Sequence, residues 1–277
     1  MTNGRRLYKD MIRDTRWWNL YLGLDVDHID VMAYCPIEDH SLFVSTIPLD
    51  DSVDGYVTRV EEAIYDNPLL LNEFSKICVV MRTDARAFLP LDVASDDRAA
   101  DIVSEMTGVA DGHLVVNELP LLKLSLCHMV DSALYNFLTR TFGQKVRITH
   151  RLASIATYCH GTHRGAGSLC SHVNLRRSSL DIVIYQGDSL LLANTYNITG
   201  VTDALYYIVA TRQLFDIDRS NAVVLSGDRD MREELSPLLR KYLPTVMPAV
   251  FPAAMFRAGG QTAMNAPTDL IVMPLCE

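Results

Sequence analysis

The stretch SLDIVIYQGDSLLLANTYNITG, residues 179–200, is typical of a strand, a tight turn through Gly187-Asp188 and a second strand. A stretch with the same plan, HIDVMAYCPIEDHSLFVSTIPL, forms residues 28–49 in the other half of the chain. Residues 29–34 align with 180–185 at an offset of 151, and the second strands align at an offset of 148. The difference lies in the turn, where a change of length costs little. Two copies of one hairpin predict an internal duplication.

The segments around the hairpins extend the repeat. A strand is expected before each hairpin, and an apolar spacing of three and four residues after it predicts a helix. A short β-branched run and a further helical stretch come next, so that the expected unit is β-β-β-α-β-α. The expected elements are strands 19–25 and 168–175, helices 53–64 and 201–209, strands 76–81 and 221–227, and helices 96–108 and 228–243.

Two regions need a separate interpretation. Pro237 lies inside the last helical stretch, and proline fits best in a first turn, so this helix is expected to start at Ser236. Residues 113–167 join the two copies without a linker-like composition. They are interpreted as one or two strands followed by helix 131–142, strand 145–149 and a helix from about 151 to 163. The expected subdomains are therefore residues 1–150, with strand and helix additions, and residues 151–277.

Three antiparallel strands followed by a crossover helix and a parallel strand form the ribonuclease-H-like unit. The predicted fold class is α/β, with two tandem ribonuclease-H-like β-β-β-α-β-α units forming an actin-like ATPase fold. The stretch from SLDIVIYQGD to the strand AVVLSGD, with the helix DALYYI and the later ELSPLLRKYL, resembles an uncharacterised family of Bacteroidetes proteins. That resemblance implies an actin-like ATPase fold without an established activity.

An actin-like ATPase needs a turn of the type Asp-x-Gly after the first strand of each half, because glycine lets backbone amides approach phosphate and aspartate holds the metal ion. In the first half Asp25 matches, but Asp27 replaces the glycine. In the second half Asn174 is aligned with the aspartate and Arg176 with the glycine. Neither turn has the pattern that phosphate binding requires.

A third turn, Ser226-Gly227-Asp228, keeps one glycine of the Gly-rich turn expected beneath the adenosine. Together with Asp25, Asp27, Asn174 and Arg176, these three residues are weak candidates for binding a cofactor in the cleft between the subdomains. We expect no catalytic residue and no cofactor. The predicted function is that of a pseudo-ATPase acting as a scaffold or protein-interaction component.

Two alternatives remain open. One is an atypical nucleotide- or anion-binding protein that uses the cleft, with ATP and magnesium as its ligands. The other is a nuclease, since the ribonuclease-H-like unit also serves enzymes that hold two metal ions with clustered carboxylates. Asp25, Asp27 and Asp30 are clustered in the sequence, but the acidic composition weighs against a nuclease.

Composition limits the class of protein. The formal net charge is −9, which argues against a general nucleic-acid binder. The N-terminal segment has no apolar core typical of a signal peptide, and no stretch is long and apolar enough to span a membrane. The six cysteines are scattered, so buried thiols are expected rather than disulfides. These features predict a cytoplasmic protein, and the predicted scaffold role implies a protein partner that the sequence does not identify.

Three smaller motifs have competing interpretations. Cys159, His163, Cys170 and His172 are a weak candidate zinc set with non-standard spacing, and a polar helix end explains them equally well. Cys127-His128 is interpreted as a core cysteine beside an outward-facing histidine. Of the adjacent tryptophans at positions 17 and 18, one is expected in the core and the other on the surface.

Overall fold

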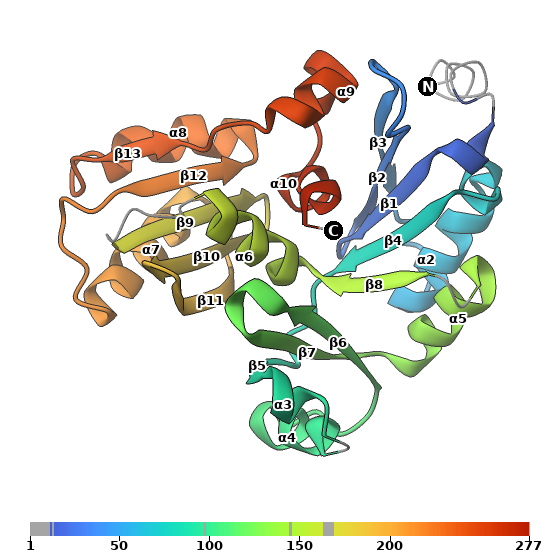
Figure 1. Ribbon diagram of the computed structural model, residues 1–277, viewed down its shortest axis with the longest axis horizontal. Coiled ribbons are helices and arrows are strands. Elements are labelled where there is room, and N and C mark those ends of the chain that lie inside the picture. Colours follow the sequence, from blue (N-terminus) through green and yellow to red (C-terminus); the bar gives the residue numbers. More distant parts are fainter. Residues whose placement is uncertain (1–11, 13, 97, 144–145, 163–168, 277) are drawn as a thin grey trace. The chain divides into compact units, whose positions relative to one another are not determined.

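The computed structural model describes residues 12, 14–96, 98–143, 146–162 and 169–276. The chain divides into two compact units (Figure 1). The first unit contains Met1–Arg151 and Phe251–Ala266, and the second contains Leu152–Val250 and Pro267–Glu277.

The first unit is built on a five-stranded sheet in the order β3-β2-β1-β4-β8. The first three strands are antiparallel neighbours, whereas β4 and β8 run parallel to β1. Helix α2 connects β3 to β4, and α5 precedes β8. The bounds are β1 Asn19–Leu24, β2 His28–Tyr34, β3 Leu42–Pro48, α2 Tyr56–Tyr65, β4 Lys76–Met81, α5 Ser132–Phe142 and β8 Arg147–His150.

The second unit repeats this topology, with strand order β11-β10-β9-β12-β13. Gly187, at the tip of its hairpin, adopts the positive φ of 57° that the tight turn requires. The bounds are β9 Leu169–Arg176, β10 Ser179–Gln186, β11 Ser189–Asn197, α7 Val201–Leu214, β12 Val223–Gly227, α8 Arg229–Leu239 and β13 Val246–Pro248. The two matching sheets confirm the predicted fold class.

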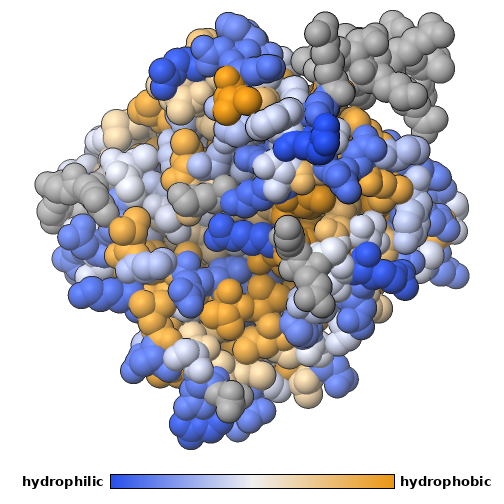
Figure 2. All heavy atoms as spheres, turned by 45° about the vertical axis from the view of Figure 1, so that its right-hand side comes forward, coloured by the Kyte–Doolittle hydropathy of each residue, from blue (hydrophilic) through white to orange (hydrophobic). Residues whose placement is uncertain are grey.

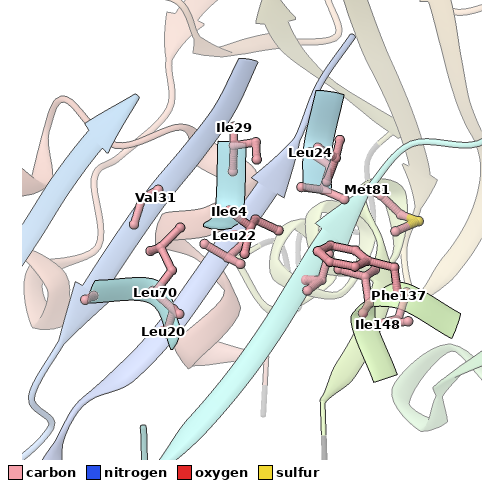
Figure 3. Packing of buried hydrophobic residues seen from close by; sticks show 14 of the residues in the cluster. Leu20, Leu22, Leu24, Ile29, Val31, Ile64, Leu70, Met81, Phe137 and Ile148 are labelled. Carbon is pink, nitrogen blue, oxygen red and sulfur yellow. The ribbon is translucent and has the colours of Figure 1, made fainter. Parts of the chain in front are cut away.

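The core of the first unit follows from the alternation of side chains along the strands. Leu20, Leu22 and Leu24 are every second residue of β1 and point to one face of the sheet. Ile64 of α2 and Phe137 of α5 cover them there (Figure 3). All five side chains are buried. Burial of each contributes on the order of 1.5–3 kcal/mol relative to exposure.

A three-stranded sheet in the order β5-β7-β6 is inserted between β4 and α5 of the first unit. Its helices α3 and α4 pack on it through their own apolar cluster. Its bounds are β5 Arg86–Pro90, α3 Leu91–Ala94, α4 Ala99–Thr107, β6 His113–Leu119 and β7 Leu124–Val130.

The insertion corrects one predicted equivalence. The stretch 96–108 is matched with 228–243 in the sequence, but it forms α4 of the inserted sheet. The helix that occupies the place of α8, between the last two strands of the sheet, is α5. Both stretches are amphipathic, and the apolar period alone does not distinguish them.

Asn117 of β6 joins the inserted sheet to the main sheet of the first unit. Its side-chain amide donates to the carbonyl of Ile148 at 3.0 Å, and its side-chain oxygen accepts from the N–H of His150 at 2.7 Å. Strand β8 is the edge strand of the main sheet, and Asn117 provides hydrogen-bond partners for two of its backbone groups.

Each unit also receives a helix that follows the last strand of the other unit. Helix α6, Arg151–Thr162, follows β8 but lies almost wholly in the second unit, where the hydroxyl of Tyr185 donates to the carbonyl of Ala156 at 2.8 Å. Helix α9, Ala253–Ala263, follows β13 but belongs to the first unit. It packs against β3, where Gly259 faces Leu42 so closely that a Cβ would lie 2.7 Å from the leucine Cβ.

Pro237 does not start a helix, contrary to the sequence-based expectation. Helix α8 begins at Arg229 and contains Pro237. Asp228 caps its start by accepting from the N–H of Met231 at 3.0 Å. The helix therefore begins where its N-cap is, and the proline is tolerated in the interior.

Other predictions are settled by burial. Trp18 is buried and Trp17 is 61% exposed, as expected, although a short 3-10 helix (Thr15–Trp17) and not a strand places them. The six cysteines are free thiols. His128 is fully buried and does not face outward, and its ring packs edge-on against that of His150 at a centroid distance of 5.3 Å. Among the described residues, no helix is both long and apolar enough to cross a membrane.

Candidate functional site

The first candidate turn connects β1 to β2 and contains Asp25 and Asp27. The N–H of Asp25 donates to the carbonyl of His28 at 3.0 Å, and the N–H of Val26 donates to the Asp25 carboxylate at 2.8 Å. A phosphate-binding turn offers such N–H groups to its ligand. In this turn both of them have acceptors within the turn itself.

Asp25 also contacts a buried arginine of its own unit. Nη1 of Arg151 lies 3.9 Å from Oδ2 of Asp25, and the arginine side chain is only 4% exposed. Tyr56 of α2 lies near the same carboxylate. Burial is the main cause that raises the pKa of its phenol to about 12, and the charge of Asp25 is the next cause. The negative charge of Asp25 therefore lies in a site that is largely closed to water.

Asp27 is 71% exposed and contacts His28. The Nδ1 atom of His28 lies 2.6 Å from the Asp27 carboxylate, and its Nε2 atom lies 3.3 Å from that of Asp30. The hydrogen bond to Asp30, followed by the charges of the neighbouring carboxylates, raises the pKa of His28 to about 9. His28 is therefore a cation at neutral pH and offsets part of the acidic cluster.

The second candidate turn connects β9 to β10, and its strand register changes the predicted correspondence between the two halves. Asn174 lies opposite Asp181, as Gly23 lies opposite Asp30 in the first unit. Arg176 is therefore the structural equivalent of Asp25, and Asn174 lies two residues earlier, inside the strand. The offset of 151 found in the hairpins thus extends through this turn, whereas the sequence alignment shifted here by two residues.

Arg176 forms an ion pair within its own unit. Its Nη1 donates to the Asp269 carboxylate at 3.0 Å, and both side chains are largely buried. Asp269 lies in the short helix α10, Thr268–Ile271. The adjacent Arg177 is 91% exposed and lies 3.9 Å from the Asp228 carboxylate. Corresponding turns thus carry ion pairs of opposite polarity, with the acid of the first replaced by a base in the second.

Asn174 belongs to a row of polar side chains across the second sheet. Its amide donates to Asp181 at 3.0 Å, and its oxygen accepts from the Ser226 hydroxyl at 3.2 Å. Thr195 donates to the other oxygen of Asp181 at 2.7 Å. In the first unit Thr46 donates to Asp30 in the equivalent register. The row satisfies a fully buried carboxylate and has a structural role.

Gly227 and Asp228 of the third candidate turn have structural requirements of their own. Gly227 has a φ of 89°, and a Cβ there would lie 2.0 Å from the carbonyl oxygen of Leu175. The N–H of Asp228 donates to that oxygen at 2.7 Å, and its side chain caps α8. The close approach of β12 to β9 is a sufficient reason for glycine at this position.

The candidate zinc set is only partly within the described residues, because His163 lies outside them. Cys159 and Cys170 are buried, and burial raises the pKa of both thiols, which favours the protonated form over the thiolate that zinc requires. Within the described part of the chain, no group of three or more His, Cys, Asp or Glu side chains is arranged to hold a metal ion.

The sequence interpretation missed the charged partners of both turns. Arg151 and Asp269 lie far from the turns in sequence, and no local pattern identifies them. Asp181 was detectable, because it aligns with Asp30 in the duplicated hairpin and both are buried acids followed by a threonine in the next strand. A buried acid at the same position of both repeats indicates that each has a hydrogen-bond partner.

The matched sheets, each covered by helices and each with a turn after its first strand, define a protein of the actin-like ATPase fold. A protein from Bacteroides thetaiotaomicron VPI-5482, described as having an actin-like ATPase fold and unknown function, superposes with a TM-score of 0.78. Its sequence is 18% identical, and the match covers 95% of this chain and 97% of that one.

The chain belongs to the family described as a protein of unknown function (DUF3822), whose model matches residues 13–246. This finding and the Bacteroides structure confirm the resemblance recognised in the sequence. A chain of the PilM-PilN type IV pilus biogenesis complex has the same fold, with a TM-score of 0.61, 10% identity, and coverage of 93% of this chain and 97% of that one. No curated protein sequence matches this chain.

Proposed function

We propose that this protein does not hydrolyse ATP and acts as a scaffold or protein-interaction component. The observation that carries the proposal is that both turns corresponding to phosphate-binding turns hold ion pairs of the chain itself, Asp25 with Arg151 and Arg176 with Asp269.

The chemistry of the two turns supports the absence of hydrolysis. At the first turn a phosphate would meet the carboxylates of Asp25 and Asp27, and the N–H groups that would bind it have acceptors already. At the second turn Arg176 replaces a carboxylate, and a guanidinium cannot coordinate magnesium. Neither turn therefore supplies both a phosphate cradle and a metal ligand.

The interaction role is supported by the likeness to the PilM-PilN structure, which is a complex of two named proteins. At 10% identity this likeness concerns the fold alone. The kind of partner that this chain binds has to be inferred from its own surface. Function resides in sites and surfaces, and the fold alone does not determine it.

A thermal-shift titration with ATP, ADP and GTP, with and without magnesium, tests the proposal. A ligand that binds only the native state adds about 2.7 kcal/mol of stability at a hundredfold excess over its Kd, which is readily detected. We expect no shift at millimolar nucleotide and no release of phosphate. A magnesium-dependent shift that is lost in Asp25→Ala would overturn the proposal.

A second candidate function is the binding of a nucleotide or another anion without hydrolysis. It is favoured by Arg177, whose guanidinium is exposed beside the second turn. Pyrophosphate in the same titration distinguishes this function, because it requires a shift that is independent of magnesium and is lost in Arg177→Ala. Arg229→Ala, which removes an exposed arginine paired with Glu233 on α8, is the matched control.

A further inference from the structure

Helix α7 presents an uncharged face to solvent. Its residues Tyr206, Val209, Ala210, Gln213 and Leu214, which we call the α7 outer face, recur at the spacing of one helical stripe and are exposed or half-buried. Tyr206 is 66% exposed and Leu214 is 81% exposed. The opposite stripe, with Ala204 and Ile208, enters the core of the second unit. The helix is therefore largely apolar on both sides.

The neighbouring helix α8 provides an internal comparison. It packs beside α7, and both helices contribute to the same core cluster of the second unit. The solvent side of α8 carries the exposed charged residues Arg229, Asp230, Glu233 and Glu234. A solvent-facing helix surface is ordinarily polar, as that of α8 is. The lack of charge on the α7 outer face is therefore a local property, and it is typical of a surface that a partner covers.

Aromatic contacts hold the exposed tyrosine of this face in place. The ring of Tyr206 meets that of Tyr207 edge-on at a centroid distance of 5.4 Å. Tyr207 in turn stacks on Tyr196 of β11 at 4.6 Å. A tyrosine that is ordered before binding loses little conformational entropy on association, and tyrosine is enriched among the residues that dominate binding energy. Tyr206 is suited to be the anchor of an interface.

The adjacent sheet edge argues that the partner is a helix and not an added strand. Strand β11 has a register shift where it pairs with Ile184 and Tyr185 of β10, which leaves Leu191 as an extra residue of β11. Further along β11, the N–H of Thr195 donates to the side chain of Asn194 at 2.9 Å. Both features protect an edge strand against pairing with another chain. Helix α7 contacts this strand through Tyr207, which stacks on Tyr196.

Charges around the α7 outer face indicate the chemistry of the partner. Asp203 and Asp216 lie at the two ends of α7, and α8 adds Asp230 and Glu234. Arg212 is buried against Ser171 and two carbonyls, Arg229 pairs with Glu233, and the exposed Arg219 donates to the carbonyl of Tyr242. From the start of α7 to the end of α8, residues 201–239, the exposed charged side chains are five acids and two arginines. The rim is therefore acidic, so it attracts a basic partner and repels an anionic lipid surface or a second copy of the same face.

We propose that the α7 outer face binds an amphipathic helix of a partner protein whose apolar stripe is flanked by lysine or arginine. The proposal rests on the interaction role proposed above and names its surface. The apolar stripe of the partner covers Tyr206 and Leu214, and its basic flanks approach the acidic rim. An amphipathic helix supplies such a stripe, because its apolar anchors recur every three or four residues.

A pair of labelled 18-residue model peptides tests the proposal by fluorescence anisotropy with the full chain. Both peptides have the same leucine stripe, and the flanks are lysine in one and glutamate in the other. We expect the lysine-flanked peptide to bind, the glutamate-flanked peptide to bind at least about tenfold more weakly, and Tyr206→Glu to weaken the lysine-flanked peptide at least about tenfold. Hydrophobic residues gather at several places on the face of the molecule in Figure 2, so the control needs an exposed apolar residue outside α7. Ile37→Glu serves, because Ile37 is 70% exposed in the first unit.

The outcomes separate this proposal from the proposed function. Failure of both peptides to bind, equal binding of the two, or an equal loss in Ile37→Glu overturns the α7 proposal. A photo-crosslinking residue at position 206, compared with one at position 37, gives an independent result in cells. A basic amphipathic helix crosslinked from position 206 supports the proposal. Crosslinks to a partner only from position 37, or to a second copy from position 206, overturn it. A partner crosslinked only from position 37 leaves the interaction role intact, whereas nucleotide hydrolysis would refute the proposed function without reference to α7.

Discussion

Replacement of Gly227 by alanine distinguishes a structural glycine from one kept for a nucleotide. The residue has a φ of 89°, and the new Cβ would lie 2.0 Å from the carbonyl oxygen of Leu175, well inside ordinary van der Waals contact. The positive φ alone costs roughly 1–2 kcal/mol for a residue with a side chain. To relieve the contact, β12 has to move away from β9, which breaks the 2.7 Å hydrogen bond from the N–H of Asp228 to the same oxygen. Loss of a buried hydrogen bond costs about 1–3 kcal/mol more.

We therefore expect Gly227→Ala to lower the free energy of unfolding by about 2–5 kcal/mol, measured by urea denaturation without any ligand. Gly187→Ala is the matched control, because Gly187 also has a positive φ, 57°, but nothing lies within 4 Å of its Cβ position. Its loss should stay near 1–2 kcal/mol. Equal losses in the two variants would refute the steric argument and return Gly227 to the list of ligand-binding candidates.

Three further predictions concern buried polar groups. Burial, and then the charge of Arg86, lower the pKa of His128 from 6.5 to about 4. Between pH 6.5 and 4, His128 is protonated in the unfolded chain but not in the native state. The free energy of unfolding should therefore fall by about 3 kcal/mol as the pH is lowered from 6.5 to 4. His128→Phe should lose that part of the pH dependence in urea titrations, and an unchanged slope would contradict it. Arg176→Met should destabilise the chain by about 3–5 kcal/mol, because it breaks a buried ion pair, while the double variant with Asp269→Leu recovers most of the loss. No recovery in thermal denaturation would argue against this account. Asn117→Ala should cost about 2–4 kcal/mol in the same assay, because two backbone groups of β8 lose their partner; a loss under 1 kcal/mol would show that water replaces it.

The fold was predictable because the duplication appears in short, regular segments. Strand β4 ends where its β-branched run ends, and both hairpins have the expected turns. The inserted sheet was only partly predictable, since β5 is five residues long and three of them are exposed or half-buried. Helix α4 and helix α5 both fit an amphipathic pattern, and the choice between them depends on which strand each one connects. That information is in the tertiary structure and not in the local period.

The candidate site was predictable in its location but not in its partners. The sequence indicated the turns at Asp25 and Arg176. It matched Asn174 with Asp25, because asparagine resembles the expected aspartate chemically, and this alignment was wrong by two positions. The strand pairing of Asn174 with Asp181 resolves the register. The buried partners Arg151 and Asp269 come from other segments of each unit, and a single sequence gives no sign that they approach the turns.

The exchange of α6 and α9 between the units has a consequence for how this chain can be cut and when it can finish folding. A fragment that ends at residue 150 would keep β3 but lack α9, and the remaining fragment would carry α9 without the strand on which Gly259 rests. No single cleavage point yields two complete units, because each unit is made from two separate segments of the chain. During synthesis residues 251–266, which complete the first unit, are made only after residues 152–250 of the second unit, so the first unit cannot be complete before most of the second has been made.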